Sequence, residues 1–310
     1  MTPASFVIPT RGRADLVIDL LKTIQRQTVR SEILIMDDGG STDLPVVVAR
    51  DFPGVRYHSI DTGRGPGFQR NRGIELASSE LVFAIDDDTV LPTPRIVERT
   101  LDDFDDPRIA AVAIPHINVR VDQQLRHRAP DDSAIWVLHA FTGASHAVRR
   151  SAFLAAGGYR EHFFYMGEEG DLCLRFLDRG LVVRAGRAEP IHHLESPQRN
   201  SALADFCGRR NDLLFAWHNV PASRLPLHLA GTTFNGVVSS LRAPNPGSAL
   251  KGMASGYAQI ASHRVTRAPV SLAAYTLQRL LKARGPLPLR DIEDRLARVD
   301  SGAVLSSKAS

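Results

Sequence analysis

The sequence comprises 310 residues, of which 43% are hydrophobic and 23% are charged, and its formal net charge is +4. This composition is ordinary for a globular protein and excludes a disordered, collagen-like or coiled-coil chain. A net charge this small gives no reason to expect nucleic acid as a partner.

Cysteine content and apolar run length indicate the compartment. The two cysteines, Cys173 and Cys207, are too few for a disulfide framework, so we expect a reducing environment. No apolar run approaches the ~20 residues that span a bilayer. Residues 1–13 also lack the basic and then apolar layout of a signal peptide. These features predict a cytoplasmic protein.

The first 85 residues alternate between short apolar runs and helical patterns. Apolar runs predict strands at 5–9, 32–36, 55–58 and 81–85. Apolar residues at helical spacing predict helices between them, for example over 16–24 and 69–77. Strands and helices alternating at this pitch predict right-handed βαβ units. We therefore expect an α/β protein with a Rossmann-like, mainly parallel central sheet flanked by helices.

Polar side chains follow three of these predicted strands. Thr10 comes after the first strand, Asp38 after the second and Asp86–Asp88 after the fourth. Functional groups of open α/β sheets gather at the carboxyl ends of the strands. The placement of these residues is therefore the first indication of a functional site.

Beyond residue 110 the alternation becomes less regular. Residues 110–115 predict one more strand, and the polar stretch 118–133 predicts a loop. A helix is expected at 151–156, and helical spacing follows the acidic cluster within 165–179. From residue 202 onward the pattern is mainly helical, with prolines that interrupt the tail.

The three consecutive carboxylates Asp86, Asp87 and Asp88 are the strongest single feature. They end an apolar strand and repel one another, so a cation is the expected compensating charge. Carboxylate oxygens favour Mg²⁺ or Mn²⁺, which commonly bind one or two carboxylates together with substrate phosphates. The alternative is a solvated turn that caps the next segment.

Other polar groups each have two interpretations. Glu168, Glu169 and Asp171 precede a helical pattern, so they either supply a general base or complement the helix dipole. His192 and His193 follow a short extended segment, and imidazole is a common metal ligand as well as a common packing residue. The order of these groups along the chain is more informative than any one of them.

That order resembles the family 2 inverting glycosyltransferases, which have the GT-A fold, over about residues 4–220. The motifs that carry the resemblance are V-I-P-T-R-G-R at 7–13, I-M-D-D-G-G-S-T-D at 35–43, Q-R-N-R-G-I at 69–74, D-D-D at 86–88, F-T-G-A at 141–144 and E-E-G-D-L-C-L-R at 168–175. A late histidine, His192 or His193, completes the set. Two departures are an extra glycine near Gly40 and Glu169 in the place of the usual aspartate.

The resemblance implies a role for each matched residue. It implies nucleotide-sugar binding by Pro9, Thr10, Arg11, Arg13, Asp38, Arg70, Asp86 and Asp87. It implies a Mn²⁺ or Mg²⁺ site formed by Asp88 and Asp86 with His192 or His193. It implies Glu169 as the catalytic base with Glu168 beside it. It also implies an acceptor site that includes Gly143, Trp136 and Asp171.

The resemblance further implies the reaction and the organisation of the chain. We expect a metal-dependent, inverting hexosyltransferase that moves a sugar from a UDP-, dTDP- or GDP-linked donor to a hydroxyl of a glycan, lipid-linked or small-molecule acceptor. Residues 1–118 would be the nucleotide-sugar-binding half of one GT-A domain. Residues 119–220 would be its acceptor-binding and catalytic half, and residues 221–310 a basic, mainly helical extension.

Two other functions stay open at this point. Asp86 and Asp88 also fit the D-x-D-x-[TV] motif of haloacid-dehalogenase-like phosphatases, which need a downstream lysine. The lysines that follow are Lys251, Lys282 and Lys308, all in the basic tail. A non-catalytic nucleotide-sugar-binding protein is the other alternative, although every expected acidic group is present.

The tail lies beyond the resemblance and differs in charge from the rest of the chain. Residues 242–310 hold 11 Lys and Arg against 4 Asp and Glu, a net charge of +7. This basic helical segment either contacts anionic lipid at the inner face of the membrane or packs on the core or on a second subunit. A homodimer is thus one of the open alternatives.

Overall fold

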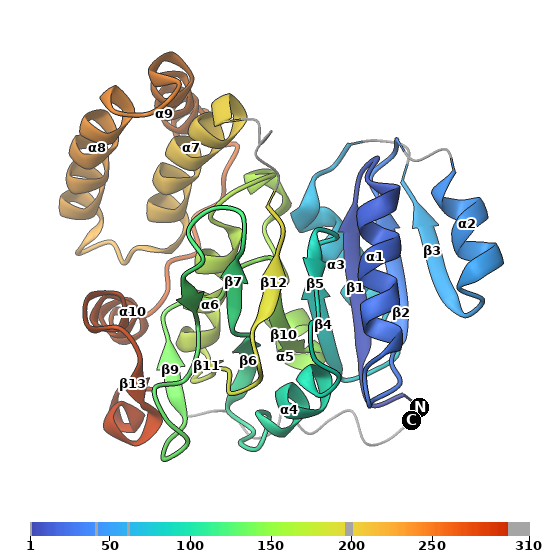
Figure 1. Ribbon diagram of the computed structural model, residues 1–310. Coiled ribbons are helices and arrows are strands. Elements are labelled where there is room, and N and C mark those ends of the chain that lie inside the picture. The colour runs from blue at the N-terminus through green and yellow to red at the C-terminus, as the bar shows by residue number, and fades with distance from the viewer. Residues whose placement is uncertain (1, 41–42, 61–62, 196–200, 297–310) are drawn as a thin grey trace.

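A computed structural model describes residues 2–40, 43–60, 63–195 and 201–296 (Figure 1). Part of the motif at 35–43 and the end of the basic tail therefore lie outside the described residues. The strands are β1 Ser5–Thr10, β2 Glu32–Asp37, β3 Val55–Ser59, β4 Leu81–Ile85, β5 Thr89–Val90, β6 Ile109–Ala113, β7 His116–Asn118, β8 Leu125–Arg126, β9 Trp136–Leu138, β10 Ser145–Arg149, β11 Val182–Ala185, β12 Ile191–His193 and β13 Leu287–Pro288.

The α-helices lie between and after these strands. They are α1 Ala14–Gln25, α2 Leu44–Asp51, α3 Pro66–Leu76, α4 Ile96–Asp102, α5 Arg150–Ala155, α6 Glu168–Asp178, α7 Ser201–Asn219, α8 Leu225–Leu241, α9 Pro246–Ala261 and α10 Leu272–Arg284. Short 3₁₀ turns occur at Glu161–Phe163, Leu289–Asp291 and Glu293–Arg295.

The expected parallel sheet is formed by the first four long strands. β3, β2, β1 and β4 are neighbours in that order and pair in parallel. Their carboxyl ends therefore meet at one edge, which carries Thr10, Asp38 and Asp86–Asp88. Within this half, α3 begins three residues before the predicted start, because Gly65 with φ = +84° turns the chain directly into Pro66.

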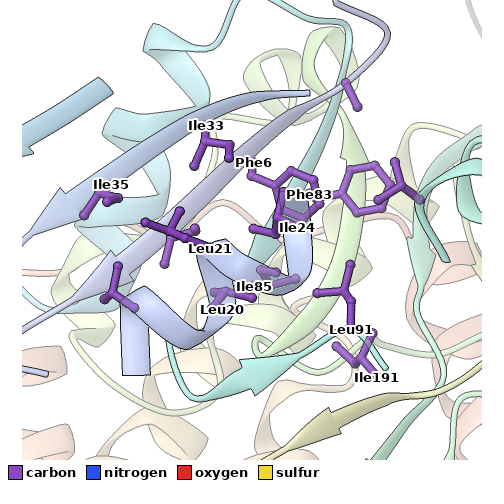
Figure 2. Packing of buried hydrophobic residues seen from close by; sticks show 14 of the residues in the cluster. Phe6, Leu20, Leu21, Ile24, Ile33, Ile35, Phe83, Ile85, Leu91 and Ile191 are labelled. Carbon is purple, nitrogen blue, oxygen red and sulfur yellow. The ribbon is translucent and has the colours of Figure 1, made fainter. Parts of the chain in front are cut away.

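Side chains of these strands alternate between two cores. Phe6, Ile8, Ile33 and Phe83 pack against α1 on one face (Figure 2). The residues between them, such as Val7, pack against α3, α5 and α6 on the other face. Burial on both faces explains why β1, β2 and β4 are apolar over most of their length, whereas the edge strand β3 is partly exposed and carries polar residues.

The whole sheet has nine strands in the order β13-β9-β11-β6-β10-β4-β1-β2-β3, and its second half is mixed. β10 lies antiparallel between β4 and β6. The sequence analysis predicted a helix at 151–156 and no strand directly before it. Ser145–Val148 are fully buried between two neighbouring strands, so long-range pairing rather than local pattern determines this strand.

A second, four-stranded sheet lies at the functional edge in the order β5-β12-β7-β8. The stretch 118–133 was predicted to be a loop, but it contains β8, which forms an antiparallel pair with β7. This small sheet joins segments far apart in sequence, because β12 pairs with both β5 and β7. Its strands carry side chains to the site described below.

The C-terminal segment is mainly helical, as expected, and it is attached to the nine-stranded sheet. Figure 1 shows α7, α8 and α9 grouped beside the sheet, with α10 below them. Leu277 and Leu281 of α10 are buried against Leu174 and Leu177 of α6. β13 extends the large sheet by pairing with β9. Among the described residues, no helix is both long enough and apolar enough to cross a membrane.

Candidate active site

A cleft of about 820 Å³ opens at the carboxyl ends of β1, β2 and β4. One side is lined by the residues after these strands, including Thr10, Asp38 and Asp86. The opposite side is lined by the N-terminal end of α6, with Glu168 and Glu169. The cleft therefore brings together acidic groups that lie about 80 residues apart in sequence.

Asp87 lies behind the surface of the cleft and holds its neighbours in place. Its side chain is fully buried and accepts hydrogen bonds from Thr10 Oγ1 at 2.6 Å and Arg13 Nε at 3.0 Å. Burial raises the pKa of Asp87 to about 7, although the charge of Arg13 opposes the rise. Asp87 therefore connects β1 to the acidic turn after β4, and Arg13 also pairs with Asp88 at 3.1 Å.

The described part of the chain contains one cluster of three side chains that could hold a metal ion together. It consists of Asp86, Asp88 and His193. One ligand atom from each residue lies within 4.8 Å of the others. His193 Nε2 is 3.1 Å from Asp88 Oδ1. Burial alone would raise the pKa of Asp88, but the hydrogen bond and charge of His193 hold it below the usual value.

Strand pairing decides which histidine faces the acidic turn. β12 runs antiparallel to β5 and places His193 opposite Thr89, beside Asp88. The Leu194 N–H donates to the carbonyl of Asp88 at 2.7 Å and fixes this register. His192 lies opposite Val90, so its side chain points to the other face of the strand pair and does not line the cleft.

Glu168 and Glu169 begin α6 and line the cleft across from the acidic turn. Arg70 of α3 lies between the two groups, with Nη2 2.5 Å from Asp86 and Nη1 3.6 Å from Glu168. The N–H of Gly143 donates to Glu169 Oε1 at 3.1 Å. A Cβ at Gly143 would lie 2.5 Å from that oxygen, so only glycine permits this contact.

The environment of the two glutamates favours their protonated forms. Burial raises the pKa of Glu168 to about 8, the charge of Glu169 adds to the rise, and Arg70 opposes it. Burial also raises the pKa of Glu169, again against Arg70. Side chains of this kind accept a proton near neutral pH, which is what general-base catalysis requires.

Asp38 lines the cleft and also shapes its wall. Its carboxylate accepts hydrogen bonds from the N–H groups of Arg64 and Gly65 at 2.8 and 3.0 Å and from Gln69 Nε2 at 2.8 Å. The loop before α3 is thereby fixed to the end of β2. Pro9, Arg11 and Arg13 also line the cleft, as the sequence analysis expected.

Two residues predicted for an acceptor site lie outside the cleft. Trp136 is on β9 at the far side of the sheet, where its Nε1–H donates to Asp131 at 3.1 Å. Asp171 is fully buried on α6 and forms ion pairs with Arg160 and Arg175. Two residues along a helix correspond to a rotation of about 200°, so Asp171 points away from the side on which Glu169 lies, and it stabilises the fold around α6.

Several cleft residues were not singled out from the sequence. His116 and Asn118 come from β7, Arg126 from β8, Gln69 from α3 and Thr142 from the segment before β10. His116 comes directly after the strand that the sequence predicts at 110–115, so the strand-end argument applies to it as well. Asn118 and Arg126 gave no local signal, because their position depends on the pairing of β7 with β12 and β8.

The phosphatase alternative needs a lysine beside Asp86 and Asp88. No lysine lines the cleft among the described residues. Lys251 lies on α9 and Lys282 on α10, and Lys308 is outside the described part. The cations next to the acidic turn are Arg13 and Arg70 instead.

Comparisons with known proteins agree with the motif order. Residues 5–160, about half of the chain, match the sequence model described as Glycosyl transferase family 2. The O-antigen chain rhamnosyltransferase RfbN of Salmonella typhimurium is 26% identical over 207 residues, 61% of this chain and 65% of the relative. The GalNAc(5)-diNAcBac-PP-undecaprenol beta-1,3-glucosyltransferase of Campylobacter jejuni is 33% identical over 96 residues, 29% of this chain and 31% of the relative. The matches thus span less than two thirds of the relatives' own lengths.

A solved structure is similar over most of the chain. The mannosyltransferase PcManGT from Pyrobaculum calidifontis, in complex with GDP-Man and Mn²⁺, superposes with a TM-score of 0.56 and 18% sequence identity. The similarity covers 91% of this chain and 80% of that one. At this identity the likeness establishes the fold, and it confirms the expected GT-A type architecture.

Proposed function

Because the chain belongs to glycosyl transferase family 2, we propose that it transfers a sugar from a nucleoside diphosphate sugar to an acceptor hydroxyl in glycan or polysaccharide synthesis. The observation that carries this proposal is the arrangement of two acidic groups across one cleft. Asp86, Asp88 and His193 form one group, and Glu168 and Glu169 form the other. A transferase of this type needs a site for the leaving diphosphate and a base for the acceptor, on opposite sides of the sugar.

The donor side of the cleft is the edge formed by β1, β2 and β4. Thr10, Asp38 and Arg11 line it at strand ends, where nucleotides bind in open α/β sheets. Arg13 and Arg70 supply positive charge close to the acidic turn. We assign the nucleoside to this edge and the diphosphate to the neighbourhood of Asp86 and Asp88.

Asp86, Asp88 and His193 fit a divalent cation by their chemistry. Two carboxylates and one imidazole would leave coordination positions for phosphate oxygens, as Mg²⁺ and Mn²⁺ sites in phosphate-handling enzymes do. When bound, such a cation stabilises the negative charge that develops on the leaving diphosphate. The similarity to a mannosyltransferase solved with GDP-Man and Mn²⁺ supports this assignment.

The proposed chemistry is a single displacement. Glu169 accepts the proton of the acceptor hydroxyl as its oxygen attacks the anomeric carbon. A bond forms between that carbon and the acceptor oxygen, while its bond to the diphosphate oxygen breaks and the nucleoside diphosphate leaves with the electron pair. Attack and departure on opposite faces invert the anomeric centre. Arg70 keeps Asp86 and Glu168 on either side of the reacting sugar.

The substitution Glu169→Gln tests the proposal. The amide keeps the size of the side chain but cannot accept the proton, so we expect kcat to fall by about 100-fold or more, with nucleoside diphosphate affinity nearly unchanged. The assay measures release of nucleoside diphosphate from a panel of UDP-, dTDP- and GDP-sugars with water or added glycans as acceptors. Glu75→Gln on the exposed side of α3 is the matched control. Wild-type turnover in Glu169→Gln, or no release from any donor, would contradict the proposal.

A further inference from the structure

A second, open cavity of about 1070 Å³ lies beside the cleft and is lined mainly by the C-terminal helices. Its walls come from α6, α7, α8 and α10. Met166 and Gly167 line both the cleft and this cavity. Gly170, two residues after Glu168 and one after Glu169, lines the second cavity while both glutamates line the cleft. The candidate base therefore lies where the two spaces meet.

The second cavity has a positively charged lining. Arg224 from the start of α8 and Arg279 and Lys282 from α10 contribute exposed side chains to its wall. No ion pair of these three side chains occurs among the described residues. The one acidic residue of the lining, Asp212, pairs with Arg209 at 3.2 Å, and the charge of Lys282 also acts on it. The arginines and the lysine of the lining thus outnumber its carboxylate, and this excess of positive charge would stabilise a bound anion.

The positive charge of the lining also lowers the pKa values of two histidines in the same cavity. Burial lowers the pKa of His228, and the charges of Arg279 and Lys282 lower it further. Burial lowers the pKa of His139, and Lys282 adds to the effect. Both histidines belong to the cavity lining, so the field reaches its interior as well as its rim.

Three helical glycines keep the cavity open. Gly170 of α6, Gly208 of α7 and Gly231 of α8 all line it, and a Cβ added to any of them would meet no atom within 4 Å. Glycine is unfavourable inside a helix, and none of these positions needs it for close packing. Each of the three helices therefore contributes a residue without a side chain to the cavity wall, and together these residues leave the cavity open.

From this geometry we infer that the second cavity binds the phosphate or diphosphate group of the acceptor. The inference rests on the proposed function, in which the donor diphosphate occupies the cleft. The acceptor hydroxyl must then approach Glu169 from the opposite side, and the second cavity lies on that side. An acceptor anchored by its phosphate between Arg279 and Lys282 would present its sugar hydroxyl to Glu169. The phosphate can belong to a lipid-linked or to a water-soluble acceptor.

Binding of inorganic pyrophosphate in the presence of EDTA tests the inference. Without a divalent cation the carboxylates of the cleft repel pyrophosphate. Calorimetry then measures the binding of pyrophosphate in the second cavity. We expect Arg279→Ala/Lys282→Ala to weaken pyrophosphate binding at least ~10-fold, because hydrogen bonds to charged groups are among the stronger ones. Lys251→Ala/Arg264→Ala removes the same charge from exposed positions outside the cavity and should change binding less than ~2-fold.

A second variant separates cavity shape from charge. Gly208→Leu projects a side chain into the open space without altering charge, and it should weaken pyrophosphate binding by a similar factor. Unchanged binding in both Gly208→Leu and Arg279→Ala/Lys282→Ala would overturn the inference. An equal loss in Lys251→Ala/Arg264→Ala would also overturn it, because the effect would then be one of overall charge.

Farnesyl diphosphate is the second probe and identifies the source of the phosphate. A lipid-linked acceptor is indicated if farnesyl diphosphate binds at least ~10-fold tighter than pyrophosphate and if its binding still depends on Arg279 and Lys282. Equal affinities indicate a water-soluble phosphorylated acceptor. Nucleoside diphosphate binding with Mn²⁺, measured on the same variants, keeps the two proposals distinct. Its absence in the wild type counts against the proposed function, whereas its presence without cavity binding of pyrophosphate counts against this inference alone.

Discussion

Arg70 is the residue that connects the two acidic sides of the cleft. Its side chain is 3% exposed, and it contacts Asp86 as well as Glu168. Burial would lower the pKa of its guanidinium, but the charge of Asp86 and then of the glutamates more than compensates. Removing a buried cation from between carboxylates strongly destabilises a protein, because the remaining negative charges are left uncompensated. The position of Arg70 is thus determined by electrostatics as well as by α3.

The pH dependence of turnover follows from the two glutamates. The base acts only when deprotonated, and burial raises the pKa of both side chains, that of Glu168 to about 8. Turnover should therefore fall as the pH drops, with an acid limb above the ordinary glutamate pKa. The measurement is kcat/KM against pH for the wild type and Glu168→Gln.

Glu168→Gln should leave that acid limb in place. Because its pKa is raised to about 8, Glu168 is still protonated while Glu169 loses its proton, so the amide replaces a neutral group. An acid limb at the usual glutamate pKa in the wild type would contradict the assigned environment. A limb that moves to lower pH in Glu168→Gln would contradict the assignment of the higher pKa to Glu168.

At the scale of single residues, strand ends and the order of the motifs were a good guide to the cleft, whereas the acceptor residues Trp136 and Asp171 lie outside it. Thr10, Asp38 and Asp86 lie in the cleft because parallel strands deliver their carboxyl ends to one edge. The choice of His193 over His192 depends on the pairing of β12 with β5, which no local pattern shows. Trp136 was named on chemistry alone, and the fold carries it elsewhere.

At the scale of elements, α7 fixes the segment that separates the two cavities. Asn211 of α7 is buried and directs Nδ2–H groups to the carbonyls of Phe163, Tyr165 and Met166 at 2.9, 2.8 and 2.6 Å. This segment leads directly into Glu168. The position of the candidate base therefore depends on a contact from a helix that lies beyond residues 5–160, which match the family model.

Asn211→Ala should loosen this segment. The substitution removes the three hydrogen bonds from Asn211 to these carbonyls, and each is worth about 0.5–1.5 kcal/mol, so we expect a lower Tm and a loss of turnover. Gln25→Ala removes an exposed amide from α1 and serves as the control. Thermal unfolding and kcat are measured on both variants. Unchanged stability and turnover in Asn211→Ala would show that the segment is held by other contacts.

The elements that the sequence analysis missed are those made by long-range pairing. β10 and β8 carry no clear alternation of polar and apolar residues, because β10 is buried on all sides and β8 is only two residues long. The early strands and α1 were recognisable because each has a strong local period. Strands that form only through contacts between distant segments thus cannot be predicted from the local sequence pattern.

At the scale of the whole molecule, the C-terminal extension is joined to the catalytic sheet. α10 covers the end of the core at β6 and α6, and β13 adds an edge strand. The basic charge of this part of the chain was evident from the sequence. Its attachment was not, because α10 and α6 are about 100 residues apart.

Two leucines of α10 test this attachment. Leu281 is fully buried, so Leu281→Ala should reduce the free energy of unfolding by about 2–5 kcal/mol. Leu272 is 45% exposed on the same helix, and Leu272→Ala should cost less than about 1 kcal/mol. Denaturant unfolding measures both. Equal and small effects would mean that α10 does not pack on the core in solution.

The most direct test of the account is a thermal-shift panel with UDP, dTDP, GDP and CMP, each with and without Mn²⁺ or Mg²⁺. A ligand at about 100 times its dissociation constant adds about 2.7 kcal/mol, enough to raise Tm by several degrees. We predict such a shift for one nucleoside diphosphate, dependent on the metal and abolished in Asp88→Asn. A protein whose Tm responds to none of these nucleotides, or equally with and without metal, would contradict the account.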